Sequence, residues 1–193
     1  MKKSIIEEYS VTLERDPETK ELTGERWKTA TGLLHGPHGP AYRKWHPQSG
    51  EITYEYWAQY GAQHREGDLP AVFSVDPETK VVFDEECLVN GEAHRTSGPS
   101  RIIRDPAYGQ VIYEEWKQHD VLDRGGDEPA VVERNPVSGI ITYSEYWQKG
   151  KLHRSSGPAV IRYDGKTGEV LPEEFYLNNQ KTLNPKELPN TSP

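Results

Sequence analysis

A histidine-arginine pair recurs along the chain at intervals of about 30 residues or their multiples, and its side chains could bind an anion. Guanidinium groups and protonated imidazoles donate charge-assisted hydrogen bonds to phosphates and carboxylates. A row of such groups, one per interval, would suit a nucleotide or another small anion. The candidate binding residues are His64, Arg65, His94, Arg95, Arg124, His153 and Arg154.

The same residues also have a structural interpretation. A glutamate recurs once per interval in most copies, and each arginine could form an ion pair with one of them; these are Glu25, Glu55, Glu85, Glu114 and Glu173. Each histidine could cap or hydrogen-bond the loop before the next Gly-Pro. Because the chain carries a net charge of -8, we favour the structural interpretation.

No segment has the pattern of a familiar catalytic or metal site. The seven histidines form no HExxH motif and no Cys-His cluster. Glu114 and Glu115 are consecutive, and on a strand they would point to opposite faces, so they cannot act as an acid/base pair. We therefore predict no enzymatic activity, no cofactor and no metal site.

Prolines divide the chain into repeats. They lie 29 to 31 residues apart at Pro40, Pro70, Pro99, Pro129, Pro158 and Pro189. This spacing predicts one repeat domain over residues 1–189, with units at approximately 10–40, 41–70, 71–99, 100–129, 130–158 and 159–189. The last residues, 190–193, are predicted to be a flexible tail.

Each unit reads as a β-hairpin. A motif such as "RDPETKE" or "RNPVSGI" predicts a type I turn that ends near the left-handed region, and the arms beside it are rich in β-branched residues. No segment has a sustained helical period. The fold class is therefore all-β: about six consecutive hairpins, with about twelve strands, in an elongated, twisted antiparallel meander sheet.

An aromatic column should run along this sheet. The seventh residue of each outgoing strand is Trp27, Trp57, Trp116, Tyr146 or Phe175, with Cys87 in the third unit. Tryptophan (5) and tyrosine (11) far outnumber phenylalanine (3), which favours rings on a half-exposed surface. We predict that the column is a structural spine and that Cys87 is a small core residue.

The string "EYWQKGKLHRSSGPAV" resembles the MORN-repeat variants of bacterial, phage and giant-virus proteins. The matching residues are Tyr146, Trp147, Gly150, His153, Arg154, Gly157, Pro158 and Ala159, and again Tyr56, Trp57, Gly61, His64, Arg65, Pro70 and Ala71. The resemblance implies a single-layer sheet of hairpins that serves as an interaction scaffold, a lipid-associated module or an antitoxin-like protein. It implies no catalytic residues.

These features predict a non-catalytic repeat-type binding protein that presents an extended acidic β-sheet surface to a protein partner. A net charge of -8 favours a partner with a basic surface, as an antitoxin or a phage-encoded inhibitor would need. It argues against direct binding of nucleic acid or membranes. The alternative is a sequestering protein that binds a nucleotide or other small anion at the His-Arg loops.

The remaining predictions concern location and assembly. One cysteine and the lack of an apolar leader or membrane-spanning run favour a cytoplasmic protein. An open meander leaves its outermost strands unpaired, so a homodimer is also consistent with the sequence.

Overall fold

The computed structural model describes residues 7–184, which form two compact units. The first unit comprises residues 7–92 and 106–108, and the second comprises residues 93–105 and 109–184. Both are built from strands and turns, with no helix among the described residues. Pro189 and the predicted tail, 190–193, lie outside these residues, and the single domain over 1–189 stays a prediction.

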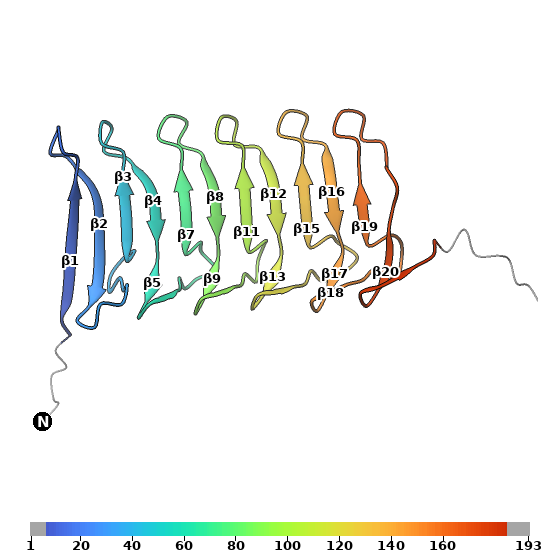
Figure 1. The fold of residues 1–193 in the computed structure, drawn as a ribbon, viewed down its shortest axis with the longest axis horizontal. Helices are drawn as coiled ribbons and strands as arrows, with labels where there is room; N and C mark the ends of the chain where they lie inside the picture. The colour runs from blue at the N-terminus through green and yellow to red at the C-terminus, as the bar shows by residue number, and fades with distance from the viewer. Residues whose placement is uncertain (1–6, 185–193) are drawn as a thin grey trace, which may run out of the picture. The chain divides into compact units, whose positions relative to one another are not determined.

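The first unit is an antiparallel meander whose long strands are hydrogen-bonded in chain order (Figure 1). These strands are β1 (Tyr9–Arg15), β2 (Leu22–Thr29), β3 (Tyr42–Trp45), β4 (Ile52–Tyr56), β7 (Val72–Val75) and β8 (Val82–Glu86). The short strands β5 (Ala58–Gln59) and β6 (Ala62–Gln63) form a separate small hairpin after β4, and β9 (Leu88–Val89) follows β8.

The second unit repeats this plan. Its long strands are β11 (Arg101–Arg104), β12 (Val111–Glu115), β15 (Val131–Arg134), β16 (Ile141–Glu145) and β19 (Val160–Arg162), again antiparallel and in chain order. Its short hairpins pair β13 (Lys117–Gln118) with β14 (Val121–Leu122), β17 (Trp147–Gln148) with β18 (Lys151–Leu152), and β20 (Phe175–Leu177) with β21 (Gln180–Thr182). β10 (Glu92–Ala93) lies in sequence at the boundary of the two units. The all-β antiparallel hairpin fold is confirmed.

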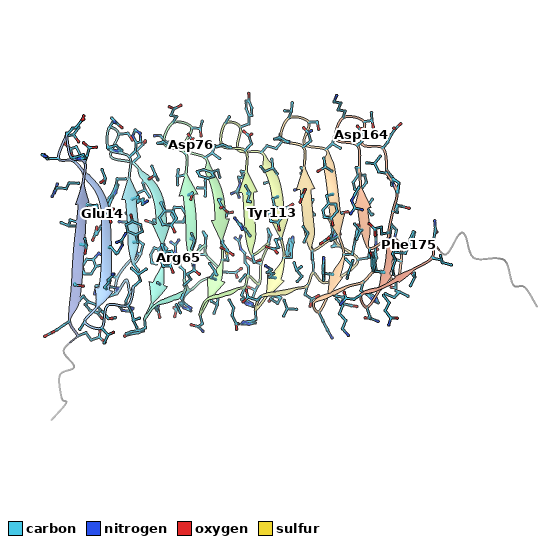
Figure 2. All side chains as sticks on the ribbon, viewed as in Figure 1. Glu14, Arg65, Asp76, Tyr113, Asp164 and Phe175 are labelled. Atoms are coloured by element: carbon cyan, nitrogen blue, oxygen red, sulfur yellow. The ribbon has the colours of Figure 1, made fainter. Side chains whose placement is uncertain are left out.

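The long hairpins turn where the sequence predicts. The Asp76 carboxylate accepts hydrogen bonds from the backbone N–H groups of Glu78 and Thr79, and Lys80 completes the turn with a φ of 65°. The bond from Thr79 is the main reason that the pKa of Asp76 lies below its ordinary value. Asp164 makes the equivalent turn in the second unit, and Figure 2 shows both aspartates at the turn ends of their hairpins.

The short hairpins were not predicted as strands. Their two central turn residues both have positive φ, at 47° and 91° for Tyr60 and Gly61 and at 50° and 73° for Lys149 and Gly150. This is the type I′ geometry that joins strands through a two-residue loop. With only two or three residues in each arm, these strands carry no detectable alternation. The six long strands of the first unit and the five of the second agree with the prediction of about twelve meander strands, and the short hairpins come in addition to it.

The buried core of each unit is thin, and one small side chain recurs in it beside larger aliphatic residues such as Leu88, Val132 and Ile161. The alanine that follows the repeat proline is 0% exposed at Ala41 and Ala71 in the first unit and at Ala130 and Ala159 in the second. Ser100 has this position in one repeat and is 1% exposed. A small side chain here lets the loop after the short hairpin lie against the strand that follows.

We expect Ala71→Leu to destabilise the protein by about 1–3 kcal/mol, because the added atoms have no space in a fully buried position. Urea unfolding monitored by tryptophan fluorescence measures this change. Ala30→Leu, at an exposed position of the same unit, is the matched control and should change stability by less than about 0.5 kcal/mol. Equal effects of the two substitutions would contradict the assignment of this alanine to the core.

Candidate functional site

The histidines of the repeated pair connect neighbouring repeats. His64 Nδ1 accepts a hydrogen bond from the backbone N–H of Asn90 at 3.1 Å. His35 Nδ1 accepts from Tyr60 at 3.2 Å in the same unit, and His153 Nδ1 accepts from the corresponding turn of the second unit at 3.2 Å. Each donor lies in the tight turn of the next short hairpin. Each of these histidines therefore links its own loop to the next repeat.

Three arginines of the pair stack on the aromatic column. The guanidinium carbon lies 4.0 Å from the ring centroid for Arg65 over Trp57, 4.0 Å for Arg124 over Trp116, and 3.7 Å for Arg154 over Tyr146. Such a stack combines cation–π attraction with contact between two flat surfaces. The Arg65 guanidinium is partly buried in its loop, and this burial lowers its pKa. Figure 2 labels Arg65 toward the end of the strands opposite the Asp76 turn.

The same arginines donate to the carbonyl of the repeat proline, five or four residues later. Arg65 Nη1 lies 3.0 Å from the Pro70 oxygen, and Arg124 and Arg154 make the equivalent bonds at 3.0 and 3.4 Å. Arg95 also donates to its proline, Pro99, at 3.4 Å. The arginine therefore closes the loop that carries it and clamps that loop onto the aromatic ring.

The predicted ion pairs with the recurring glutamates are wrong for three of these arginines. Within residues 7–184 no such pair forms for Arg65, Arg124 or Arg154. Arg154 instead binds Asp127, with two bonds of 2.9 and 3.0 Å, and this contact is the main reason that the pKa of Asp127 is lowered. For Arg65 the ring of the same repeat and a proline carbonyl are the direct partners, although the charge of Glu55 still opposes the lowering of its pKa.

The remaining pair of candidate residues, His94 and Arg95, has a different environment. The ring of His94 lies 4.2 Å from the ring of His119, and its Nδ1 atom is buried with no hydrogen-bond partner among the described residues. The His94 loop is nonetheless held by its neighbour, since the Gln118 side-chain amide donates to the Arg95 carbonyl at 2.6 Å. The seven predicted binding residues thus lie in four equivalent loops. His64 and Arg65 line one pocket of the first unit, and Arg124, His153 and Arg154 line one pocket of the second unit.

The aromatic column is half-buried and linked to the glutamates. Trp57 Nε1 donates to Glu55 at 2.9 Å, and Trp27 makes the equivalent bond to Glu25. Glu55 is only 5% exposed, and Arg43 neutralises it with two bonds of 2.7 Å. Trp116, Tyr146 and Phe175 are also half-buried, and the Cys87 thiol is buried. In the first unit the recurring glutamate therefore pairs with the column itself. In the second unit Glu114 pairs with Arg134 at 2.6 Å, and the Trp116 indole nitrogen has no hydrogen-bond partner among the described residues.

A second aromatic row, which was not among the sequence-based predictions, lies on the opposite face. In the second unit Glu133 stands in register between Tyr113 and Tyr143 on the neighbouring strands. Both tyrosines are half-buried, while Glu133 is exposed and has no ion-pair partner among residues 7–184. The signal was available, since tyrosine occupies the fourth position of the outgoing strand in three repeats, at Tyr54, Tyr113 and Tyr143.

The hydroxyls of this row stay protonated at neutral pH. Burial, followed by the nearby Glu115 carboxylate, raises the pKa of Tyr113 to about 12. Burial also raises the pKa of Tyr143, whose hydroxyl donates to Glu145. The negative charge of the Tyr113–Glu133–Tyr143 row therefore comes from carboxylates. Arg162 lies in register with Tyr143, 5.4 Å from the centroid of its ring, so a cation of the chain itself already lies over one of these rings. This combination suits a cationic side chain.

No group of three or more metal-ligating side chains that could hold an ion occurs among the described residues. Within the same residues no helix is long and apolar enough to cross a membrane. No protein-family model matches the chain, and no curated protein or solved structure matches it.

We expect Arg124→Ala to destabilise the protein by about 1–2 kcal/mol, because it removes both the stack on Trp116 and the bond to the Pro129 carbonyl. Thermal and urea unfolding measure the loss. Lys166→Ala, which removes an exposed cation from a hairpin turn of the same unit, is the control and should have almost no effect. A stability equal to that of the control would mean that the stack does not support the fold.

Proposed function

We propose that the chain is a non-catalytic binding scaffold whose sheet surface recognises a protein partner with a basic surface. The single observation that carries the proposal is the Tyr113–Glu133–Tyr143 row, where an exposed carboxylate without an ion-pair partner among residues 7–184 stands between two half-buried rings. Tyrosines that are anchored by packing and still partly exposed are typical of the residues that dominate protein interfaces.

Charge supports a basic partner. The chain carries a net charge of -8. Glu133 is in register with both tyrosines, and Glu145 lies on a flanking strand, while Glu115 is paired with Lys117 at 2.9 Å. Electrostatic complementarity of this kind mainly increases the rate of association and the selectivity for partners of opposite charge. An inhibitor or antitoxin that covers the basic surface of a nucleic-acid-binding enzyme is one role of this class.

The resemblance to MORN-repeat variants is consistent with such a scaffold and stays a prediction, as does the cytoplasmic location. The alternative function, capture of a small anion at the His-Arg loops, also stays a prediction, and the contacts of the loops count against it. The Nδ1 atoms of His64 and His153 already accept backbone hydrogen bonds, and the guanidinium groups of Arg65 and Arg154 already have a ring and a carbonyl as partners.

The test begins with capture of a partner from a native lysate of the source cells on the immobilised protein, followed by measurement of the affinity with purified components. We expect Glu133→Lys to weaken binding by about tenfold or more, because it places a cation in a surface that recognises cations. Glu169→Lys, which makes the same charge change at an exposed turn of the same unit, is the matched control and should weaken binding by about twofold at most.

Two results would contradict the proposal. A partner whose affinity does not fall as salt concentration rises would not be held by charge complementarity. Equal losses in Glu133→Lys and Glu169→Lys would mean that only the net charge matters and that the tyrosine row is not the recognition surface.

A further inference from the structure

The first repeat departs from the others at one position of the clamping loop. Counting back from the repeat proline, Arg65, Arg95, Arg124 and Arg154 are equivalent, and the first repeat has Gly36 in their place. A Cβ atom at Gly36 would lie 2.0 Å from the Gly39 carbonyl oxygen, so the local backbone accepts only glycine here. The loop that carries a guanidinium in the other repeats therefore carries none in this one.

A pocket lies between this loop and the Trp27 ring. It has a volume of about 200 Å³ and is lined by Trp27, Glu25, Arg43, His38, Pro37 and Pro40, together with the two loop glycines. Trp27 is half-buried, and among residues 7–184 no arginine or lysine is stacked on its ring, in contrast to the stacks on Trp57, Trp116 and Tyr146. The ring that is covered in three other repeats here borders a cavity.

The charges around the pocket favour a cation. Glu25 accepts the Trp27 indole N–H and forms no ion pair within the described residues. Arg43 faces Glu25 across the two strands, but its guanidinium is held by Glu55 through two bonds of 2.7 Å. The Arg43 charge is thus compensated by Glu55, while the Glu25 carboxylate keeps lone pairs for a further donor.

We propose that this Trp27 pocket binds an arginine side chain from the partner protein, with the guanidinium over the indole ring and donating to Glu25. The chain's own stacks are the template, because Arg65 and Arg124 show that the repeat holds a guanidinium 4.0 Å from the centroid of this ring type. Arginine suits the pocket better than lysine, since a planar guanidinium stacks on an indole and offers several donors in a fixed fork. The inference rests on the proposed function, because it names the chemistry of a basic partner.

The direct test needs no partner. The indole N–H resonance of Trp27, assigned with Trp27→Phe, is followed by NMR as the blocked peptide acetyl-Ala-Arg-Ala-amide is added. We expect a saturable shift of this resonance, while the resonances of Trp57 and Trp116 stay in place because their rings are already covered. The citrulline analogue, which keeps the shape and loses the charge, should bind about tenfold more weakly or worse.

Variants separate the pocket from the general charge of the surface. Glu25→Gln keeps the ring and should weaken the peptide about tenfold, since it replaces a charged acceptor with a neutral one. Trp116→Phe is the matched control, since its ring is covered by Arg124, and it should bind the peptide as the wild type does. In Arg124→Ala the uncovered Trp116 ring should gain a response to the peptide.

The outcomes are decisive in either direction. No shift of Trp27 at high peptide concentration, an equal response to the citrulline peptide, or an equal response of all tryptophans would overturn the pocket. Failure of the pocket is distinct from failure of the proposed function. If Glu133→Lys weakens binding of a captured partner and Glu25→Gln does not, the binding scaffold is supported and the arginine pocket is not. Peptide binding at Trp27, with no protein partner whose affinity falls as salt concentration rises, would support the arginine pocket and contradict the proposed function.

Discussion

The contact between one repeat's loop and the next repeat's short hairpin is the interaction on which the structure depends. In the first unit the backbone of this loop is bonded on both sides of His64: Gln63 O accepts from Gly91 N at 2.8 Å, and Arg65 N donates to Leu88 O at 3.3 Å. The imidazole adds the bond to Asn90. Since a thin core of alanines and a few larger aliphatic side chains buries little apolar surface, these bonds between repeats contribute stability that a thick core would otherwise supply.

The contact between repeats also explains why the histidines and arginines of the His-Arg loops have structural partners. A row of imidazoles and guanidiniums resembles an anion site when it is read as a list of functional groups. In the folded chain, Nδ1 of His153 is an acceptor for a turn N–H, and Arg154 lies on Tyr146 and binds a carbonyl. The recurrence of these residues follows from the recurrence of the joint between repeats, where His64 and His153 serve as acceptors and Arg65, Arg124 and Arg154 serve as clamps.

The sequence was sufficient for the fold class, the long hairpins and their turns, because these depend on local signals: Asp-Pro and Gly at fixed spacing and β-branched arms. It was insufficient for the short hairpins, where strands of two residues carry no periodicity. It also gave the wrong partners for Arg65 and Arg154, because the charge of a glutamate is visible in a sequence while the distance to a ring is not. The tyrosine row was missed because Tyr113 and Tyr143 belong together only through Glu133, which stands between them in the sheet register.

Because the repeats are joined mainly by backbone hydrogen bonds, a side chain of the loop can change without loss of the contact between repeats. The loop at Gly36 keeps its backbone bond to the next repeat, with Gly36 N donating to Ala58 O at 3.0 Å, and His35 keeps its bond to Tyr60. The loss of the arginine side chain at this position therefore removes a clamp without removing the joint. What remains is the Trp27 indole, bonded to the Glu25 carboxylate, with a pocket beside them that no arginine of the same loop fills. One change, from arginine to glycine at this position, can therefore leave the backbone bonds to the next repeat in place. The same change leaves the Trp27 ring open to a ligand, as the proposal requires.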